Sequence, residues 1–157
     1  MSWKSVQAKA SEVCGRHLEG FLPASDVAFE RAGRAMVQGV EFQRGHGALK
    51  KSFGVNVYWR FLHPGVSDGT LAFRQNIGWL GSGRQLWFAM GSAQEVAKSM
   101  EQLAGLLPEV AKFLGEVCGG RRLYVMHFGR HVAEERIKDS LEGLSAEEIE
   151  RIWELNN

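Results

Sequence analysis

Two periodicities of apolar residues divide the chain into segments of different structure. Near its start, apolar positions such as Trp3, Val6 and Ala10 recur every three or four residues, which predicts an amphipathic helix over residues 1–21. The clearest alternation lies in residues 53–61, where every odd position is large and apolar while the even positions are Gly, Asn, Tyr and Arg. A period of two predicts a strand with one buried face.

Further alternating runs surround this strand. Short glycine-rich connections of the kind that join antiparallel neighbours separate several of them. With residues 71–77 and 85–90 included, the runs amount to about five strands within residues 26–90. Because these strands follow one another without intervening helices, we predict a single antiparallel sheet; parallel neighbours would each require a crossover connection.

The apolar period returns to three and four after the sheet. Ser92 and Glu95 have the spacing of a capping box, in which each side chain bonds a free backbone amide at a helix start. We therefore expect a helix over residues 92–117. Pro108 should kink this helix or split it in two, because proline lacks a backbone donor.

The C-terminal part, residues 121–157, is predicted to be a helical extension. A second capping box, Ser145 with Glu148, begins a short amphipathic helix, whereas residues 121–127 fit a strand or a helix start equally well. The whole chain, residues 1–157, is therefore expected to form one α+β domain. Helices at both ends of the sequence would pack on one face of the sheet and leave the opposite face open.

Composition agrees with one globular domain. The 157 residues are 45% hydrophobic and 24% charged with a formal net charge of +1, which argues against a dedicated nucleic-acid-binding surface. The sequence has no apolar run near the ~20 residues of a membrane span and no signal-peptide pattern, so we expect a cytoplasmic protein without a membrane partner. Cys14 and Cys118 are too few for a disulfide framework and are expected to be reduced and buried.

Charge is distributed unevenly along the chain. Residues 1–91 carry a net charge of +5, whereas residues 92–157 carry −4, with the acidic side chains concentrated from Glu134 onward. This acidic part is either a solvated helix face or a contact surface for a basic partner.

Signatures of catalysis and cofactor binding are weak in this sequence. His127, His131 and Glu135 have the four-residue spacing at which one side of a helix can present metal ligands. The residues between the two histidines lack the general base of a zinc-hydrolase helix motif, so we expect no metal. Residues 78–84 are rich in glycine, but they lead into a strand, whereas a phosphate-binding loop leads into a helix. We expect no cofactor and see no positive indication of an enzyme.

The open face of the predicted sheet supplies the candidate binding residues. Polar side chains of its strands would project from that face, and Trp79 lies among glycines where an indole is hard to bury and could anchor a partner. Basic and aromatic residues also mix here, as in single-strand nucleic-acid binders, but alternation assigns Trp59 to the core, so we do not expect a nucleic acid. The candidates for partner binding are Gln43, Asn56, Tyr58, Arg60, Arg74 and Trp79.

Four short motifs follow one another along the chain: Phe21 ahead of Phe29-x-Arg31, Val40-Glu41-Phe42-Gln43-Arg44, Phe53-Gly54-Val55-Asn56-Val57, and Arg74 with Ile77-Gly78-x-Leu80. Their order resembles a bacterial family known only as a domain of unknown function. The resemblance covers about residues 3–117, whereas residues 22–25 and the last forty residues depart from it. Some of these relatives look like immunity proteins, so the resemblance implies a protein-binding module that neutralises a cognate toxin.

Two other functions stay open on the sequence. A small-molecule-binding or enzymatic domain would use the same sheet face, and would there have a deep concavity with titratable groups of perturbed pKa. A flat or convex patch with Trp79 projecting would instead indicate a protein-binding surface. A structural subunit of an assembly would show a large apolar self-interface.

Overall fold

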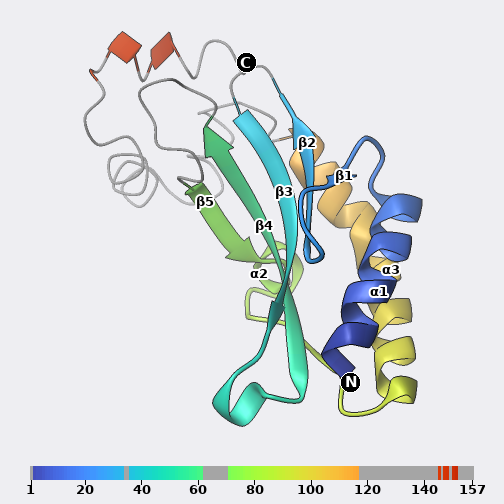
Figure 1. The fold of residues 1–157 in the computed structure, drawn as a ribbon. Helices are drawn as coiled ribbons and strands as arrows, with labels where there is room; N and C mark the ends of the chain where they lie inside the picture. Colours follow the sequence, from blue (N-terminus) through green and yellow to red (C-terminus); the bar gives the residue numbers. More distant parts are fainter. Residues whose placement is uncertain are drawn as a thin grey trace.

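Two long helices lie side by side on one face of a single antiparallel sheet (Figure 1). The computed structural model describes residues 2–33, 36–61 and 71–116, together with residue 145, residues 147–148 and residues 150–151. The helices are α1 (Ser2–His17) and α3 (Ala93–Glu116). This arrangement confirms the predicted α+β class with helices on one face.

The sheet is a meander in which consecutive strands are neighbours. Its order is β1-β2-β3-β4-β5, and β6 pairs with β4 along the same edge as β5. A 3₁₀ turn, η1 (Gly47–Leu49), lies between β3 and β4, and the short helix α2 (Gly78–Gly81) lies between β5 and β6. The strands are β1 (Leu22–Pro23), β2 (Ala28–Ala32), β3 (Met36–Arg44), β4 (Ser52–Phe61), β5 (Leu71–Asn76) and β6 (Trp87–Ala89).

The odd-numbered side chains of β4 form the centre of the hydrophobic core, as their alternation predicts. Directly paired residues in an antiparallel sheet share a face, and Val57 is paired with Val40 of β3. Phe53 stacks on Phe88 of β6 with ring centroids 5.2 Å apart. Four apolar side chains of β4 are at most 2% exposed: Phe53, Val55, Val57 and Trp59.

Each long helix contributes one apolar stripe to this core. α1 buries Cys14, where loss of solvent raises the pKa of the thiol to about 12, so this cysteine is a neutral apolar group as expected. α3 begins at the predicted cap, since the amide of Glu95 donates to Oγ of Ser92 at 3.2 Å. The helix continues through Pro108 as one element, so the alternative of two helices is wrong.

A polar link fastens the sheet to the end of α3 within the apolar layer. Nε2 of Gln38, a residue only 2% exposed, donates to the carbonyl oxygen of Leu114 at 2.7 Å. Its Oε1 in turn accepts from the guanidinium of Arg31 at 2.8 Å, and that guanidinium lies 4.9 Å from the ring centroid of Phe21. Both ends of the buried carboxamide are therefore satisfied, as burial of a polar group requires.

Other predicted features lie at the limits of the described residues. The capping box of the C-terminal part forms, because the amide of Ser145 donates to Glu148 at 2.8 Å and the amide of Glu148 donates to Oγ of Ser145 at 3.2 Å. Most of the predicted extension 121–157, including its undecided segment 121–127, lies outside the described residues, and so does Cys118.

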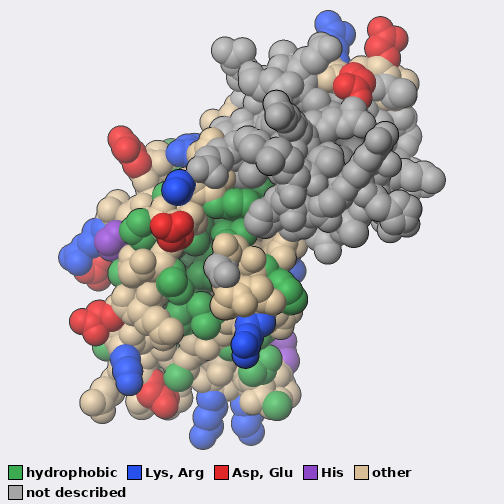
Figure 2. Space-filling model, turned by 180° about the vertical axis from the view of Figure 1, so that it is seen from behind, with side chains coloured by type: hydrophobic (Ala, Val, Ile, Leu, Met, Phe, Trp, Pro, Cys, Tyr) green, Lys and Arg blue, Asp and Glu red, His purple; other side chains and the backbone are tan. Residues whose placement is uncertain are grey.

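Seen from behind, hydrophobic side chains gather near the centre of the surface and charged side chains surround them (Figure 2).

Candidate functional site

The second face of the sheet carries no helix among the elements that the structure describes (Figure 1). We call it the open face. The register of the strands places Gly54, Asn56 and Tyr58 of β4 on it, opposite Gln43, Glu41 and Gly39 of β3 respectively. The even positions of β4 thus project away from the helices, as the alternation predicts.

A looped-out segment interrupts the sheet edge next to β4. Both β5 and β6 pair antiparallel with β4: Asn56 pairs with Asn76 at the end of β5, and Gly54 pairs with Trp87 at the start of β6. β5 and β6 therefore lie along β4 one after the other, as two parts of one edge strand, and residues 77–86 are inserted between them. The insertion contains α2 and delivers its side chains to the border of the open face.

Asn76 closes the base of this insertion. Its Oδ1 accepts from the amides of Gly78 and Leu86, both at 2.8 Å, and its Nδ2 donates to the carbonyl oxygen of Leu86 at 3.1 Å. A Cβ at Gly78 would overlap the backbone of Arg84 and Leu86, so this position admits only glycine without a shift of the chain. The segment is held rigidly where it leaves and rejoins the sheet.

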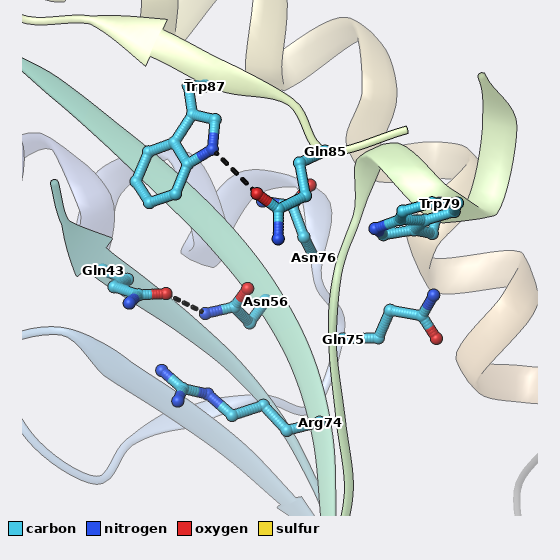
Figure 3. Close-up of a pocket in the computed structure, with 8 residues that line it drawn as sticks. All are labelled: Gln43, Asn56, Arg74, Gln75, Asn76, Trp79, Gln85 and Trp87. Carbon is cyan, nitrogen blue, oxygen red and sulfur yellow. Dashed lines mark hydrogen bonds between the residues drawn. The ribbon is translucent and has the colours of Figure 1, made fainter. Parts of the chain in front are cut away.

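A pocket of about 430 Å³ lies where this segment meets the open face. We call it the amide pocket. Its walls come from β3, β4, β5, β6 and the inserted segment. Figure 3 shows Gln75 and Trp79 on the opposite side of β5 from Gln43, Asn56 and Arg74, because Gln75 is paired with Val57 and shares its face of the sheet. The lining also includes Arg74, Trp79 and Trp87, and five carboxamides belong to it: Gln43, Asn56, Gln75, Asn76 and Gln85.

Several hydrogen-bonding groups of the amide pocket stay available to a ligand. Nδ2 of Asn56 donates to Oε1 of Gln43 at 3.0 Å, which uses only one polar atom of each carboxamide. The indole of Trp87 donates to Oε1 of Gln85 at 3.4 Å. Within the described part of the chain, no partner is found for Nε2 of Gln43, Oδ1 of Asn56 or the carboxamide of Gln75.

The two indoles of the pocket are placed differently. Trp87 packs against the backbone of β4, since a Cβ at Gly54 would lie 3.3 Å from its six-membered ring. Trp79, on α2, is 46% exposed, as its glycine-rich surroundings predict. One indole therefore forms part of the base, and the other offers free aromatic surface at the border.

Charge in the pocket is neutralised. Of the described side chains that line it, only Arg74 is charged, and its guanidinium forms an ion pair with Glu41 of β3. Both side chains of this pair remain partly exposed. The pocket thus presents donors and acceptors rather than a net charge.

A second set of polar side chains on the open face forms hydrogen bonds among its own members. We call it the locked cluster: Glu30, Gly39, Tyr58 and Arg60. The hydroxyl of Tyr58 donates to Oε1 of Glu30 at 2.6 Å, and Arg60 donates to both oxygens of that carboxylate, at 3.2 and 2.7 Å. The Tyr58 ring lies over Gly39, where a Cβ would overlap it.

The charges of the locked cluster shift two pKa values in opposite directions. The hydrogen bond from Arg60 is the main cause that holds the pKa of Glu30 below its ordinary value, and the Tyr58 hydroxyl adds to it. Burial, then the hydrogen bond to Glu30, raises the pKa of Tyr58. The cluster therefore consists of a carboxylate, a guanidinium and a neutral phenol.

The structure brings four of the predicted binding residues together and separates the other two. Gln43, Asn56, Arg74 and Trp79 line the amide pocket, whereas Tyr58 and Arg60 do not. Tyr58 is 4% exposed, so the expectation that its side chain is free on the surface is wrong. The cause is Gly39, whose missing side chain leaves a recess that the Tyr58 ring fills.

Four other lining residues are not among the binding residues predicted from the sequence. They lie on β5, on β6 and on the segment between these strands. That β5 and β6 both pair with β4 is a long-range feature of the fold. One local signal could have pointed to them: residues 74–76 are all polar and stand at the end of a predicted strand, shortly before Gly78. The residues are Gln75, Asn76, Gln85 and Trp87. The weak metal-ligand candidates His127, His131 and Glu135 lie outside the described residues.

Comparison with protein-family models, curated proteins and solved structures finds no match for this chain. The resemblance to a bacterial family of unknown function therefore stays a prediction. Within the described residues, the helices are all too short or too polar to cross a membrane.

Proposed function

We propose that this protein is a ligand-binding domain that holds a small polar molecule in the amide pocket. Ligand pockets in proteins commonly enclose about 300–1,000 Å³ and combine aromatic walls with a few placed polar groups. The amide pocket has a volume of about 430 Å³, two indoles and five carboxamides. The concavity favours a small-molecule site over a flat patch, whereas the groups of perturbed pKa, which the sequence analysis associates with an enzymatic pocket, lie in the locked cluster instead.

The observation that carries the proposal is the pair of idle polar atoms on the open face, Nε2 of Gln43 and Oδ1 of Asn56. These atoms are not among the fully buried unpaired polar atoms of the described residues, so they face solvent in the pocket. The polar groups of the locked cluster, on the same face, are instead bonded to one another. A ligand in the pocket can bond the idle atoms in place of water.

The test is a ligand screen read at the pocket's own nitrogen atoms. ¹⁵N-labelled protein is titrated with small saccharides, nucleosides, amino acids and organic anions, while the indole signal of Trp79 and the side-chain amide signals of Gln75 and Gln85 are followed. We expect at least one class to shift these signals in a saturable manner. No shift with any class, or shifts confined to other residues, would contradict the proposal.

Two substitutions serve as matched reporters for this screen. Trp79→Ala removes an exposed indole from the pocket border and should abolish the response. Leu49→Ala removes a side chain that is also exposed, at 38%, but lies on η1 between β3 and β4. The Leu49 variant should bind as the unaltered protein does.

A protein partner is the second candidate function, and the 46% exposure of Trp79 favours it. Indoles at the surface are preferred anchors of protein contacts. The predicted toxin-neutralising role is tested by coexpression with the product of the neighbouring gene. A complex that forms with the unaltered protein and is lost in Trp79→Ala would support this role, and the absence of both complex and rescue would remove it.

A further inference from the structure

We infer that one end of the molecule is a docking surface for an acidic protein partner, a function separate from the ligand binding proposed for the amide pocket. Figure 1 shows that α1, α3 and β4 all begin at this end, next to η1. We call it the basic end and define it as residues 2–8, 44–51 and 89–99. It carries one acidic side chain, Glu95, and five lysines and arginines: Lys4, Arg44, Lys50, Lys51 and Lys98.

Backbone hydrogen bonds join the segments of the basic end. The amide of Gly45 donates to the carbonyl oxygen of Ser52 at 2.9 Å, which closes the turn between β3 and β4. The amide of Met90 donates to the carbonyl oxygen of Lys51 at 2.8 Å, so this turn lies beside the segment that leads into α3. The positive charges of the turn and of the start of α3 are therefore held on one surface.

The cations of the basic end are available to a partner. All five are exposed, and among the described residues none of them has an ion pair. Arg60 and Arg74, by contrast, are bonded to carboxylates on the open face. Figure 2 shows Lys and Arg side chains projecting from the lower end of the molecule, where η1 lies in Figure 1. Unpaired charge of one sign attracts a surface of the opposite sign and steers its approach.

An exposed apolar side chain lies among these cations. Leu49 of η1 is 38% exposed. The turn that carries it is tight, because a Cβ at Gly45 would lie 2.1 Å from the carbonyl oxygen of Leu49. A contact that is already ordered loses less conformational entropy on binding. An apolar centre with a charged rim is the usual anatomy of a protein interface.

Other anionic partners match this surface less well. Binders of single-stranded nucleic acid stack bases on exposed aromatic rings, whereas Trp3, the one Phe, Trp or Tyr of the basic end, is packed against the core. Membrane-binding basic segments carry about 4–8 lysines and arginines, whereas residues 44–51 carry three. A protein surface with carboxylates around a small apolar pocket satisfies both the cations and Leu49.

The closing experiment measures binding of defined probes to the full chain. The test probe is a fluorescent glutamate-rich peptide with a central leucine, and its control has glutamine in place of glutamate. A single-stranded DNA oligonucleotide and vesicles of phosphatidylcholine with phosphatidylserine are titrated separately. Saturable binding of the acidic peptide that weakens with added salt and exceeds binding of every other probe supports the inference. Absence of such binding, or binding to DNA or vesicles that is as tight as binding to the peptide, would overturn it.

Charge-reversal variants locate the contact. Lys50→Glu should raise the peptide Kd about fivefold, because it replaces an attraction by a repulsion at the surface. Lys112→Glu makes the same change at an exposed position near the other end of α3. This control should keep the Kd within about twofold, because salt screens charges over such a distance. Equal Kd values for the two variants would overturn the inference.

Two further variants separate this surface from the amide pocket. Leu49→Ala should weaken binding of the acidic peptide and keep the ligand response of the pocket, whereas Trp79→Ala should do the reverse. A protein that binds the peptide but shows no pocket ligand would lose the ligand-binding function alone. Loss of peptide binding in Trp79→Ala, with Leu49→Ala unaffected, would overturn the basic end as the contact surface.

Discussion

The locked cluster and the amide pocket lie on the same face of one sheet, yet they treat their polar groups in opposite ways. On β4, Tyr58 and Asn56 are two positions apart and nearly equally buried, at 4% and 5% exposure. The Tyr58 hydroxyl is bonded to Glu30, which also accepts from Arg60. Asn56 bonds Gln43 through one atom and leaves its oxygen toward the pocket.

This difference teaches that burial of a polar side chain does not by itself indicate a structural role. Polar groups that satisfy one another contribute to stability and have little left to offer a partner. Polar groups that are positioned but unpaired contribute little to stability and are available for recognition. The comparison predicts that substitutions in the locked cluster lower stability, whereas substitutions in the pocket lower binding.

The largest effect on stability is expected from Gly39→Ala. The added Cβ overlaps the Tyr58 ring, so the ring must leave its recess and its bond to Glu30 must break. We expect a loss of about 3 kcal/mol in the free energy of unfolding, measured by urea denaturation. Gly15→Ala is the matched control: its Cβ meets open space on α1, and the helix should gain about 0.5–1 kcal/mol. Equal effects of the two variants would contradict the locked cluster.

Asn76→Ala sharpens the comparison because Asn76 both fastens the inserted segment and lines the amide pocket. The change removes three hydrogen bonds that hold the ends of the inserted segment. We expect a loss of about 2 kcal/mol and, in addition, weaker ligand binding, because the segment carries Trp79 and Gln85. Thermal unfolding and titration of the same sample check both results. Loss of stability with unchanged binding would show that the segment does not shape the pocket.

Glu30→Gln removes the charge at the centre of the locked cluster. We expect a loss of about 1.5 kcal/mol at pH 7, since hydrogen bonds to charged groups contribute about 1.5–3 kcal/mol. Because the folded protein lowers the pKa of Glu30, this contribution is present above the unfolded pKa of about 4.3 and is lost as pH falls through the folded value. The difference between wild type and variant, measured by denaturation from pH 7 to pH 3, should therefore shrink below about pH 4. A difference that stays constant over this range would contradict the ion pair.

The smallest effect on stability is expected from Gln75→Ala. Within the described residues its carboxamide has no hydrogen-bond partner to lose, so the free energy of unfolding should change by less than about 0.5 kcal/mol. Calorimetric unfolding checks this value. A loss above about 1.5 kcal/mol would show that the Gln75 side chain contributes to packing.

Much of the fold is predictable because it follows local periodicity. Alternation in residues 53–61 identifies the central strand and its buried side, and helical spacing identifies α1 and α3. Burial of apolar side chains at a fixed period determines these elements without knowledge of distant partners. Pro108 shows the limit of such rules, because packing of the surrounding stripe keeps α3 continuous.

The candidate site is predictable only in part. Alternation places Gln43 and Asn56 on the open face, but the fate of Tyr58 depends on the register that puts Gly39 beside it. The role of Asn76 depends on two strands that pair with the same neighbour and enclose a ten-residue insertion, residues 77–86. These are long-range relations, and no local pattern contains them.

Parallel measurement of stability and affinity in Tyr58→Phe and Gln75→Ala tests the division between the locked cluster and the lining of the amide pocket most directly. Tyr58→Phe removes one hydroxyl from the locked cluster and should lower the Tm by about 3 °C, equivalent to about 1 kcal/mol, with ligand Kd unchanged within twofold. Gln75→Ala should leave the Tm unchanged and raise the Kd at least tenfold. A tenfold weaker Kd in Tyr58→Phe, or an unchanged Kd in Gln75→Ala, would contradict the division into a stabilising cluster and a binding pocket.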